Sequence, residues 1–240
     1  MERFISFINS YSVYFCISLS VILHFLILNR KKKDLKINSL CIFIISILCN
    51  AICILASKLL YYLEFAISNN GILPKIIFDA GFSFFGTVYF APIFYTVTAL
   101  ILKLNVKKVL DIATPAVLIS SFCCRLNCMF AGCCTGIEIL NTGIKVPTRE
   151  IELACYLSIF ILLIYKDHKN ILKLGTAYPI YLIIYGIVRM IEEPFRLAFK
   201  NSNIHFALIH STASIAVGGL MYWIFTRKSN IYKETSKNKP

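Results

Sequence analysis

The chain has 240 residues, of which 58% are hydrophobic and only 15% are charged. This composition excludes a disordered chain and argues against an ordinary soluble domain. The net charge of +13 gives no reason to expect a nucleic-acid partner, because the basic residues gather in alternate loops between apolar segments, as they do in membrane proteins.

Seven apolar segments are expected to cross a membrane as helices, since one crossing takes about 17–25 residues. In chain order they cover residues 11–28, 40–60, 76–102, 109–130, 151–165, 177–191 and 206–225. The fifth and sixth are short and need their polar flanks to complete a crossing. The predicted fold class is therefore all-α, a polytopic integral membrane protein with about seven transmembrane helices.

The predicted domain organisation is a single transmembrane domain over residues 1–240. It comprises a helical membrane domain at 1–228 and a basic cytoplasmic tail at 229–240. We expect no cleavable signal peptide, because the first apolar segment lacks a preceding basic region and is followed at once by the basic run at 30–33.

The basic residues also predict an orientation. Of the 25 Lys and Arg, sixteen follow the first, third, fifth and seventh segments, in groups of five, three, three and five. The positive-inside rule assigns these loops to the cytoplasm. The N-terminus is then expected outside and the C-terminus in the cytoplasm, as an odd number of crossings requires.

Charged side chains within the apolar segments are the main indication of function. Tyr181, Tyr185, Arg189 and Glu193 are spaced four residues apart, which places them on one face of a helix. One interpretation is an internal ion pair between Arg189 and Glu193, because buried charges are normally paired. The other is that Arg189, together with Arg125, holds the phosphate of a phospholipid, to which an arginine donates two parallel hydrogen bonds.

Five cysteines lie close together near the end of the fourth segment, at positions 123, 124, 128, 133 and 134. They contain no CxxC pair, and their spacing fits neither a zinc ribbon nor a thioredoxin-type motif. We interpret them chiefly as small hydrophobic side chains and expect no metal site. A membrane thiol oxidoreductase built on this cluster is an alternative.

Three ordered motifs resemble those of the prolipoprotein diacylglyceryl transferase family. They are R-x(2)-C-x(3)-G-C-C-x-G at Arg125–Gly136, P-T-x(3)-E at Pro147–Glu152 and Y-G-x(2)-R-x(3)-E-x(2)-R at Tyr185–Arg196. The resemblance extends from about Gly81 to the end of the seventh segment. The family has seven spans with the N-terminus outside, in agreement with the orientation above.

The resemblance implies a reaction and a set of partners. The family moves the diacylglyceryl group of phosphatidylglycerol onto the lipobox cysteine in the signal peptide of a prolipoprotein, and glycerol phosphate leaves as a thioether forms. The implied partners are therefore phosphatidylglycerol, the prolipoprotein and membrane lipid, with no nucleic acid and no cofactor. The implied location is the bacterial plasma (inner) membrane, as a multi-pass protein.

The resemblance also implies roles for particular residues. Arg125 and Arg189 would contact the phosphate, Glu193 would hold Arg189 or assist proton transfer, and Tyr185 would orient the headgroup. The further residues implied in substrate binding are Arg196, Gly136, Glu152, Ser83 and Gly86.

The chain departs from the family at one position that matters for the chemistry. The family usually reads G-G-x-S-F-H-G-G in the third segment, whereas here Phe85 stands where the histidine would be. Phenylalanine cannot accept a proton. The acceptor thiol could be activated by the two arginines, or Cys128, His205 or His210 could compensate. A different acceptor and a non-catalytic lipid-binding protein are further alternatives.

Overall fold

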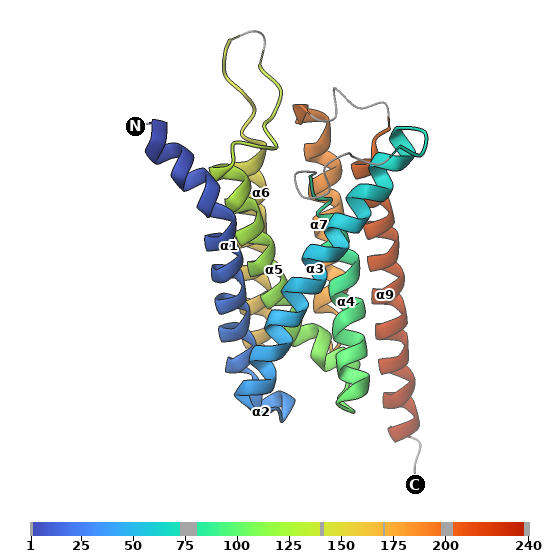
Figure 1. The fold of residues 1–240 in the computed structure, drawn as a ribbon. Coiled ribbons are helices and arrows are strands. Elements are labelled where there is room, and N and C mark those ends of the chain that lie inside the picture. Colours follow the sequence, from blue (N-terminus) through green and yellow to red (C-terminus); the bar gives the residue numbers. More distant parts are fainter. Residues whose placement is uncertain (1, 73–80, 140–141, 170, 198–203, 238–240) are drawn as a thin grey trace.

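The structure is a computed structural model that describes residues 2–72, 81–139, 142–169, 171–197 and 204–237. Its described part consists of helices, with two isolated β-bridges and no strand (Figure 1). The elements are α1 (Glu2–Arg30), α2 (Lys32–Leu35), α3 (Ser39–Ser68), α4 (Phe85–Ile101), α5 (Val106–Phe130), α6 (Thr148–His168), α7 (Ala177–Glu192), the 3₁₀ turn η1 (Glu193–Phe195) and α9 (Phe206–Lys237).

A long helix lies over each of the seven predicted apolar segments. Four of them are long and apolar enough to cross a membrane: 11–30 in α1, α3, α5 and 206–227 in α9. Helix α4 is apolar but shorter, at 17 residues. The all-helical membrane class is thus confirmed. Residues 76–80 of the third predicted segment and residues 238–240 of the predicted tail lie outside the described residues.

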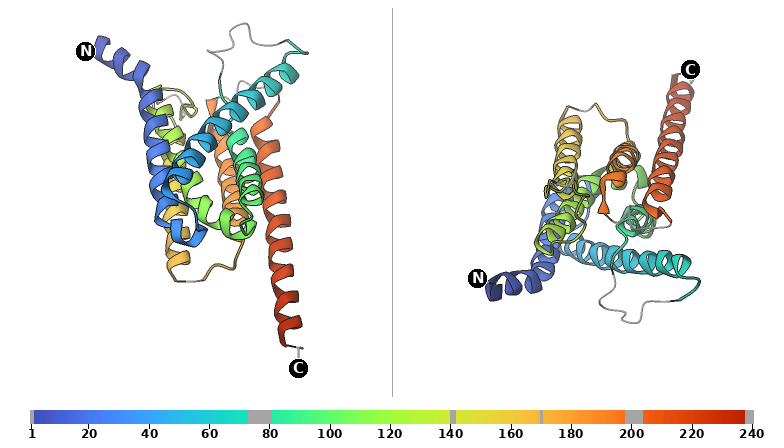
Figure 2. Two further views of the ribbon diagram at one scale, coloured as in Figure 1. Left: turned by 60° about the horizontal axis from the view of Figure 1, so that its bottom comes forward. Right: turned by 90° about the horizontal axis from the view of Figure 1, so that it is seen from above.

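The helices pack as a bundle that α3 crosses obliquely (Figures 1 and 2). Helix α1 packs on α5, α3 on α4, and α7 on α9, while α5 also contacts α6 and α7. The core between them holds small and aromatic side chains, among them Ala91, Ala116 and Tyr178. Helix α5 is therefore central, and its side chains can meet those of α6 and α7.

Two helices begin with an asparagine cap. The side chain of Asn38 accepts a hydrogen bond from Cys41 N before α3, and the side chain of Asn105 accepts one from Lys108 N before α5. Such caps satisfy backbone donors that the first helical turn leaves open. They fix the starts of both helices at one end of the bundle.

Ion pairs connect loops at that same end. Lys31 lies 2.9 Å from Asp167, and Lys108 lies 3.8 Å from Asp34. These contacts join the loop after α1 to the end of α6 and to the start of α5. The N-terminal end of α1 and the loop between α5 and α6 lie at the opposite end (Figure 1).

Candidate active site

Two arginines from different helices converge on one glutamate inside the bundle. Arg125 Nε of α5 lies 2.8 Å from Glu152 Oε2 of α6, and Arg189 Nη1 of α7 lies 3.4 Å from Glu152 Oε1. The three side chains are only 4%, 2% and 4% exposed, for Arg125, Glu152 and Arg189 respectively. Buried charge requires close partners of opposite sign, and here each carboxylate oxygen faces one guanidinium.

The turn after α7 adds more charged groups to this pair of arginines. Arg189 Nη2 donates to Glu193 Oε2 at 2.7 Å, and Arg189 Nη1 lies 3.6 Å from Glu192 Oε2. Arg196 Nη1 approaches Glu193 Oε2 at 3.6 Å. Pro194 has no backbone N–H to continue the hydrogen bonding of α7, so the helix ends in the 3₁₀ turn η1. This turn brings Arg196 next to Glu193. The internal ion pair, one of the two interpretations of the helical spacing, is therefore present.

The loop that follows α5 is fastened to the turn that follows α7. Gly136 and Arg196 form an antiparallel bridge, which is flanked by hydrogen bonds from Ile137 N to Phe195 O at 2.8 Å and from Leu197 N to Thr135 O at 3.1 Å. A Cβ at position 136 would lie 2.8 Å from the Cβ of Val146. Only glycine fits this approach. The bridge joins the first motif to the third, and Glu152 of the second motif contacts Arg125 and Arg189, so the three motifs meet at one place.

Aromatic rings surround the buried charges. The Tyr185 ring stacks on Tyr156 at 6.1 Å and contacts Phe84 at 5.7 Å and Phe85 at 5.6 Å between centroids. Arg125 lies over the Phe84 ring at 5.7 Å. Arginine over an aromatic face gains further electrostatic attraction, most of all where water is excluded.

Tyr156 was not predicted, although it stands four residues after Glu152. Its hydroxyl donates to Glu152 Oε1 at 3.2 Å. The spacing of four residues on a helix is the signal that could have identified it.

Several polar atoms of the site have no hydrogen-bond partner among the described residues. The donors among them include Arg189 Nε, Arg196 Nε and the Tyr185 hydroxyl, and the acceptors include both carboxylate oxygens of Glu192, all of them buried. Leaving a buried donor unsatisfied costs about 1–3 kcal/mol. An anionic group with several oxygens could accept from these donors.

Ser83 and Gly86 lie beside α3. Ser83 Oγ donates to Glu64 Oε1 at 2.6 Å, and Ser83 N donates to Ser57 O at 3.0 Å. A Cβ at position 86 would lie 2.6 Å from the Ala56 carbonyl carbon. Gly86 therefore has a packing reason to be glycine that is independent of substrate binding.

A histidine and a glutamate meet on the far side of Phe85. His210 Nε2 of α9 lies 3.0 Å from Glu64 Oε1 of α3, and the two side chains are 17% and 18% exposed. The His210 ring stacks on Phe85 at 5.0 Å, and Arg189 lies over the same Phe85 ring at 5.8 Å. Sequence reasoning considered His210 but had no signal for Glu64, which is 146 positions away.

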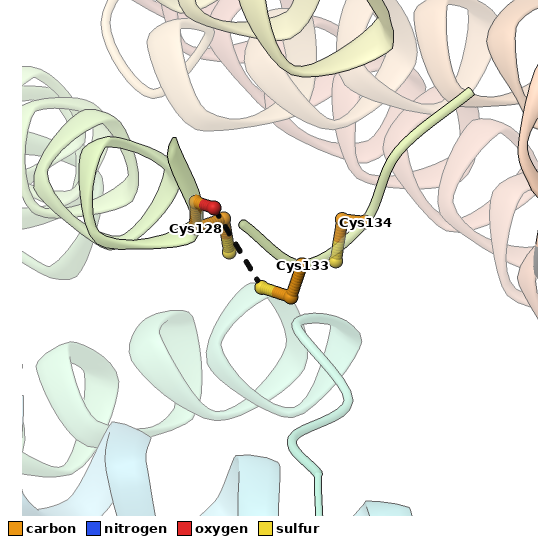
Figure 3. A group of neighbouring side chains, drawn as sticks. All are labelled: Cys128, Cys133 and Cys134. Carbon is orange, nitrogen blue, oxygen red and sulfur yellow. Dashed lines mark hydrogen bonds between the residues drawn. The ribbon is translucent and has the colours of Figure 1, made fainter. Parts of the chain in front are cut away.

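Three of the five clustered cysteines come together where α5 ends. The sulfur atoms of Cys128, Cys133 and Cys134 all lie within 4.8 Å of one another (Figure 3). Cys133 Sγ also contacts Cys128 O at 3.8 Å. Thiol donation from Cys128 and Cys133 lowers the pKa of Cys134 below its ordinary value, against the opposing effect of burial, and the positive charges of Arg125 and Arg196 lower it further. Cys123 is buried in the bundle and does not join the group.

Comparison with known proteins matches this chain to one family over most of its length. The sequence model of the prolipoprotein diacylglyceryl transferase family matches residues 4–224. A phosphatidylglycerol–prolipoprotein diacylglyceryl transferase of Clostridium tetani is 29% identical over 194 residues, which cover 74% of this chain and 77% of the relative. A second protein of that name, numbered 2, from Clostridium perfringens is 28% identical over 201 residues, with coverage of 76% and 77%.

Proposed function

This chain belongs to the prolipoprotein diacylglyceryl transferase family and is a membrane transferase, and from that premise we propose that it moves the diacylglyceryl group of phosphatidylglycerol onto the lipobox cysteine of a prolipoprotein. In this reaction the cysteine sulfur attacks the glyceryl carbon. The bond from that carbon to the phosphate oxygen breaks, and the electron pair leaves with glycerol phosphate. A thioether remains on the acceptor.

The observation that carries the proposal is the buried pair of arginines held on Glu152. Glu152 holds Arg125 and Arg189 at 2.8 and 3.4 Å, and Arg189 also contacts Glu193 and Glu192 at 2.7 and 3.6 Å. Negative charge grows on the phosphate as its bond to carbon breaks. Preorganised donors in a site closed to water stabilise such charge at low reorganisation cost. Arg189 Nε and the Tyr185 hydroxyl, which lack partners among the described residues, are the donors we assign to the phosphate oxygens.

We assign the acceptance of the thiol proton to His210. Glu64 Oε1 lies 3.0 Å from His210 Nε2, and with the ring proton on Nε2, next to that carboxylate, Nδ1 is left as the proton acceptor, 3.4 Å from the Tyr89 hydroxyl. A carboxylate that holds one ring nitrogen commonly fixes the tautomer in this way. The His210 ring packs directly on Phe85, the residue at the position of the family's usual histidine. The proposed base His210 is thus separated from Arg189 by the Phe85 ring, and it belongs to α9, whereas the family's usual histidine would stand at position 85 in α4.

We further propose seven crossings with the N-terminus outside. The contacts of Lys31 with Asp167 and of Lys108 with Asp34 support this orientation, because they join at one end of the bundle the loops that the positive-inside rule assigns to the cytoplasm. The loop that follows α5, with Cys133 and Cys134, and the site around Arg125 and Arg189 then lie toward the outer side. Fusions of a reporter that is active only outside the membrane, placed after residues 70 and 228, should be active and inactive respectively.

The test of the activity is a direct measurement of thioether formation. The purified full-length chain would be incubated in liposomes of phosphatidylglycerol with a peptide carrying a lipobox cysteine, and the peptide would be weighed by mass spectrometry. We expect a gain of one diacylglyceryl unit, which Arg189→Ala abolishes. The matched control is Arg227→Ala, since Arg227 is an exposed arginine on α9 that lies over Trp223. No gain with the unaltered chain, while phosphatidylglycerol remains bound, would refute the lipobox cysteine as the acceptor.

A further inference from the structure

The cluster of three thiols formed by Cys128, Cys133 and Cys134 has no role in the transfer reaction described above. Its members do not resemble the cysteines of the core, because Cys133 is exposed and the other two are half-buried, whereas Cys16, Cys49 and Cys53 are buried. The interpretation as small hydrophobic side chains therefore does not account for this group. The spacing of these residues fits no common zinc motif, which is why the sequence led us to expect no metal.

From this geometry we propose that Cys128, Cys133 and Cys134 bind one thiophilic metal ion of the d10 class, such as Zn²⁺ or Cu⁺. All three sulfur atoms lie within 4.8 Å of one another. A bond of about 2.3 Å from each sulfur to a zinc ion places the sulfurs about 4 Å apart. Closing the site thus takes a sulfur movement of roughly 1 Å or less, which rotation of the side chains can supply.

The backbone of the loop positions the two adjacent cysteines for shared ligation. Cys134 has φ +58°, in the left-handed region that residues other than glycine rarely adopt, and Gly132 just before the pair has φ +66°. A non-glycine residue held there costs on the order of 1–3 kcal/mol and persists only where the surroundings require it. This turn directs the Cys134 side chain to the same side as Cys128 and Cys133, as Figure 3 shows.

The surrounding charge suits a thiolate site. Three thiolates around a divalent ion leave one net negative charge. Arg149 Nη1 lies 3.5 Å from both Cys128 O and Cys133 O, so a cation stands next to two of the three ligand residues. Soft thiolate ligands select Zn²⁺ and Cu⁺ over hard cations such as Mg²⁺ or Ca²⁺.

The bound ion would cross-link the end of α5 to the loop that covers the arginine site. Cys134 O accepts a hydrogen bond from Thr148 Oγ1 at 3.2 Å, and two residues later Gly136 pairs with Arg196. The loop is thus connected to the start of α6 and to the turn after α7. The ion would hold this connection in place without entering the chemistry.

The test is a metal titration of the full-length protein, purified in detergent and kept reduced. Cd²⁺ is the probe, followed by its sulfur-to-metal charge-transfer absorption, with Zn²⁺ and Cu⁺ as competitors that separate the two natural candidates. We expect one Cd²⁺ per chain, displaced by at least one competitor. Cys133→Ser and Cys134→Ser should each weaken binding at least about tenfold, since even outer-shell changes at metal sites cost that much.

Cys41→Ser serves as the matched control, because Cys41 is an exposed cysteine at the start of α3 and should leave the titration unchanged. If Cys128→Ser fails to fold, the metal titration of Cys133→Ser still tests the proposal, because Cys133 is exposed and its replacement should not disturb the fold. Absence of a one-to-one Cd²⁺ complex, or its full retention in Cys133→Ser and Cys134→Ser, would overturn the proposal. A disulfide between two of the three cysteines in protein taken directly from cells would overturn it as well. None of these measurements depends on transferase activity.

Discussion

Arg125 and Glu152 form an ion pair inside the helical bundle, with 2.8 Å between Arg125 Nε and Glu152 Oε2. The pair joins α5 to α6 and is nearly closed to solvent. A buried ion pair adds little to the stability of a protein compared with apolar side chains of similar volume. Removal of one partner alone, however, leaves an uncompensated buried charge and destabilises the fold. Glu152 is therefore expected to matter for stability as well as for the geometry of the site.

The first prediction concerns Glu152→Gln, which keeps the shape of the side chain and removes its charge. Two buried arginines would then face each other with less compensation, and the free energy of unfolding should fall by about 3–5 kcal/mol. Thermal unfolding in detergent would measure this. Glu150→Gln is the control, since Glu150 is exposed and lies 3.7 Å from the half-buried Arg149, and a contact of this kind near the surface is worth about 0–1 kcal/mol. Equal effects of the two variants would contradict the structural role of Glu152.

The second prediction concerns Arg189→Lys. Arg189 reaches Glu152 and Glu193 with separate nitrogens of one planar group, and a lysine ammonium cannot reproduce this fork. We expect the rate of diacylglyceryl transfer to fall about 100-fold, the effect of losing one preorganised donor to the developing charge. The measurement is kcat with liposomal phosphatidylglycerol, compared with Arg227→Lys. A kcat within a factor of two of the unaltered enzyme would show that Arg189 acts only as a point charge.

Local spacing was enough to predict part of this site. Because residues four apart share a helix face, the contact of Arg189 with Glu193 followed from the sequence, and it is confirmed at 2.7 Å. The helical class followed from the apolar segments in the same way. These features depend on neighbours within a few turns of one helix.

The rest of the site depends on how distant segments pack, which no spacing within the chain encodes. Glu152 lies between two arginines that are 27 and 37 positions away from it, and only the contacts of α5 with α6 and α6 with α7 bring them together. His210 and Glu64 are 146 positions apart in the sequence, with α4 to α7 between them. The three cysteines likewise meet through a left-handed turn at Cys134 that the CxxC criterion does not detect.

The third prediction distinguishes His210 from the other candidate bases. His210→Ala should lower kcat about 100- to 10,000-fold, the usual contribution of a positioned general base, and leave KM for phosphatidylglycerol unchanged. Added imidazole should restore part of the activity, because it can fill the vacated space beside Glu64 and accept the proton. A residue with a merely structural role would not be rescued in this way.

Two sets of variants test whether His210 itself accepts the proton. Glu64→Gln should cause a smaller loss of kcat than His210→Ala, since it weakens the orientation of the ring and leaves the base in place. His205→Ala and Cys128→Ser test the remaining candidates. A loss in His205→Ala, or a loss in Cys128→Ser that Cys133→Ser does not share, with His210→Ala fully active, would assign the proton to a different group.

The last prediction separates packing from substrate contact at Gly86. An added methyl group there would lie 2.6 Å from the Ala56 carbonyl carbon, so Gly86→Ala should force α3 and α4 apart and destabilise the protein by about 1–3 kcal/mol. Gly219, on α9, has nothing within 4 Å of an added Cβ, and Gly219→Ala should be neutral or stabilise by up to about 1 kcal/mol. Thermal unfolding of both variants measures the difference. If Gly86→Ala left the unfolding midpoint unchanged and only raised KM for phosphatidylglycerol, contact with the lipid, and not helix packing, would be the reason for glycine at this position.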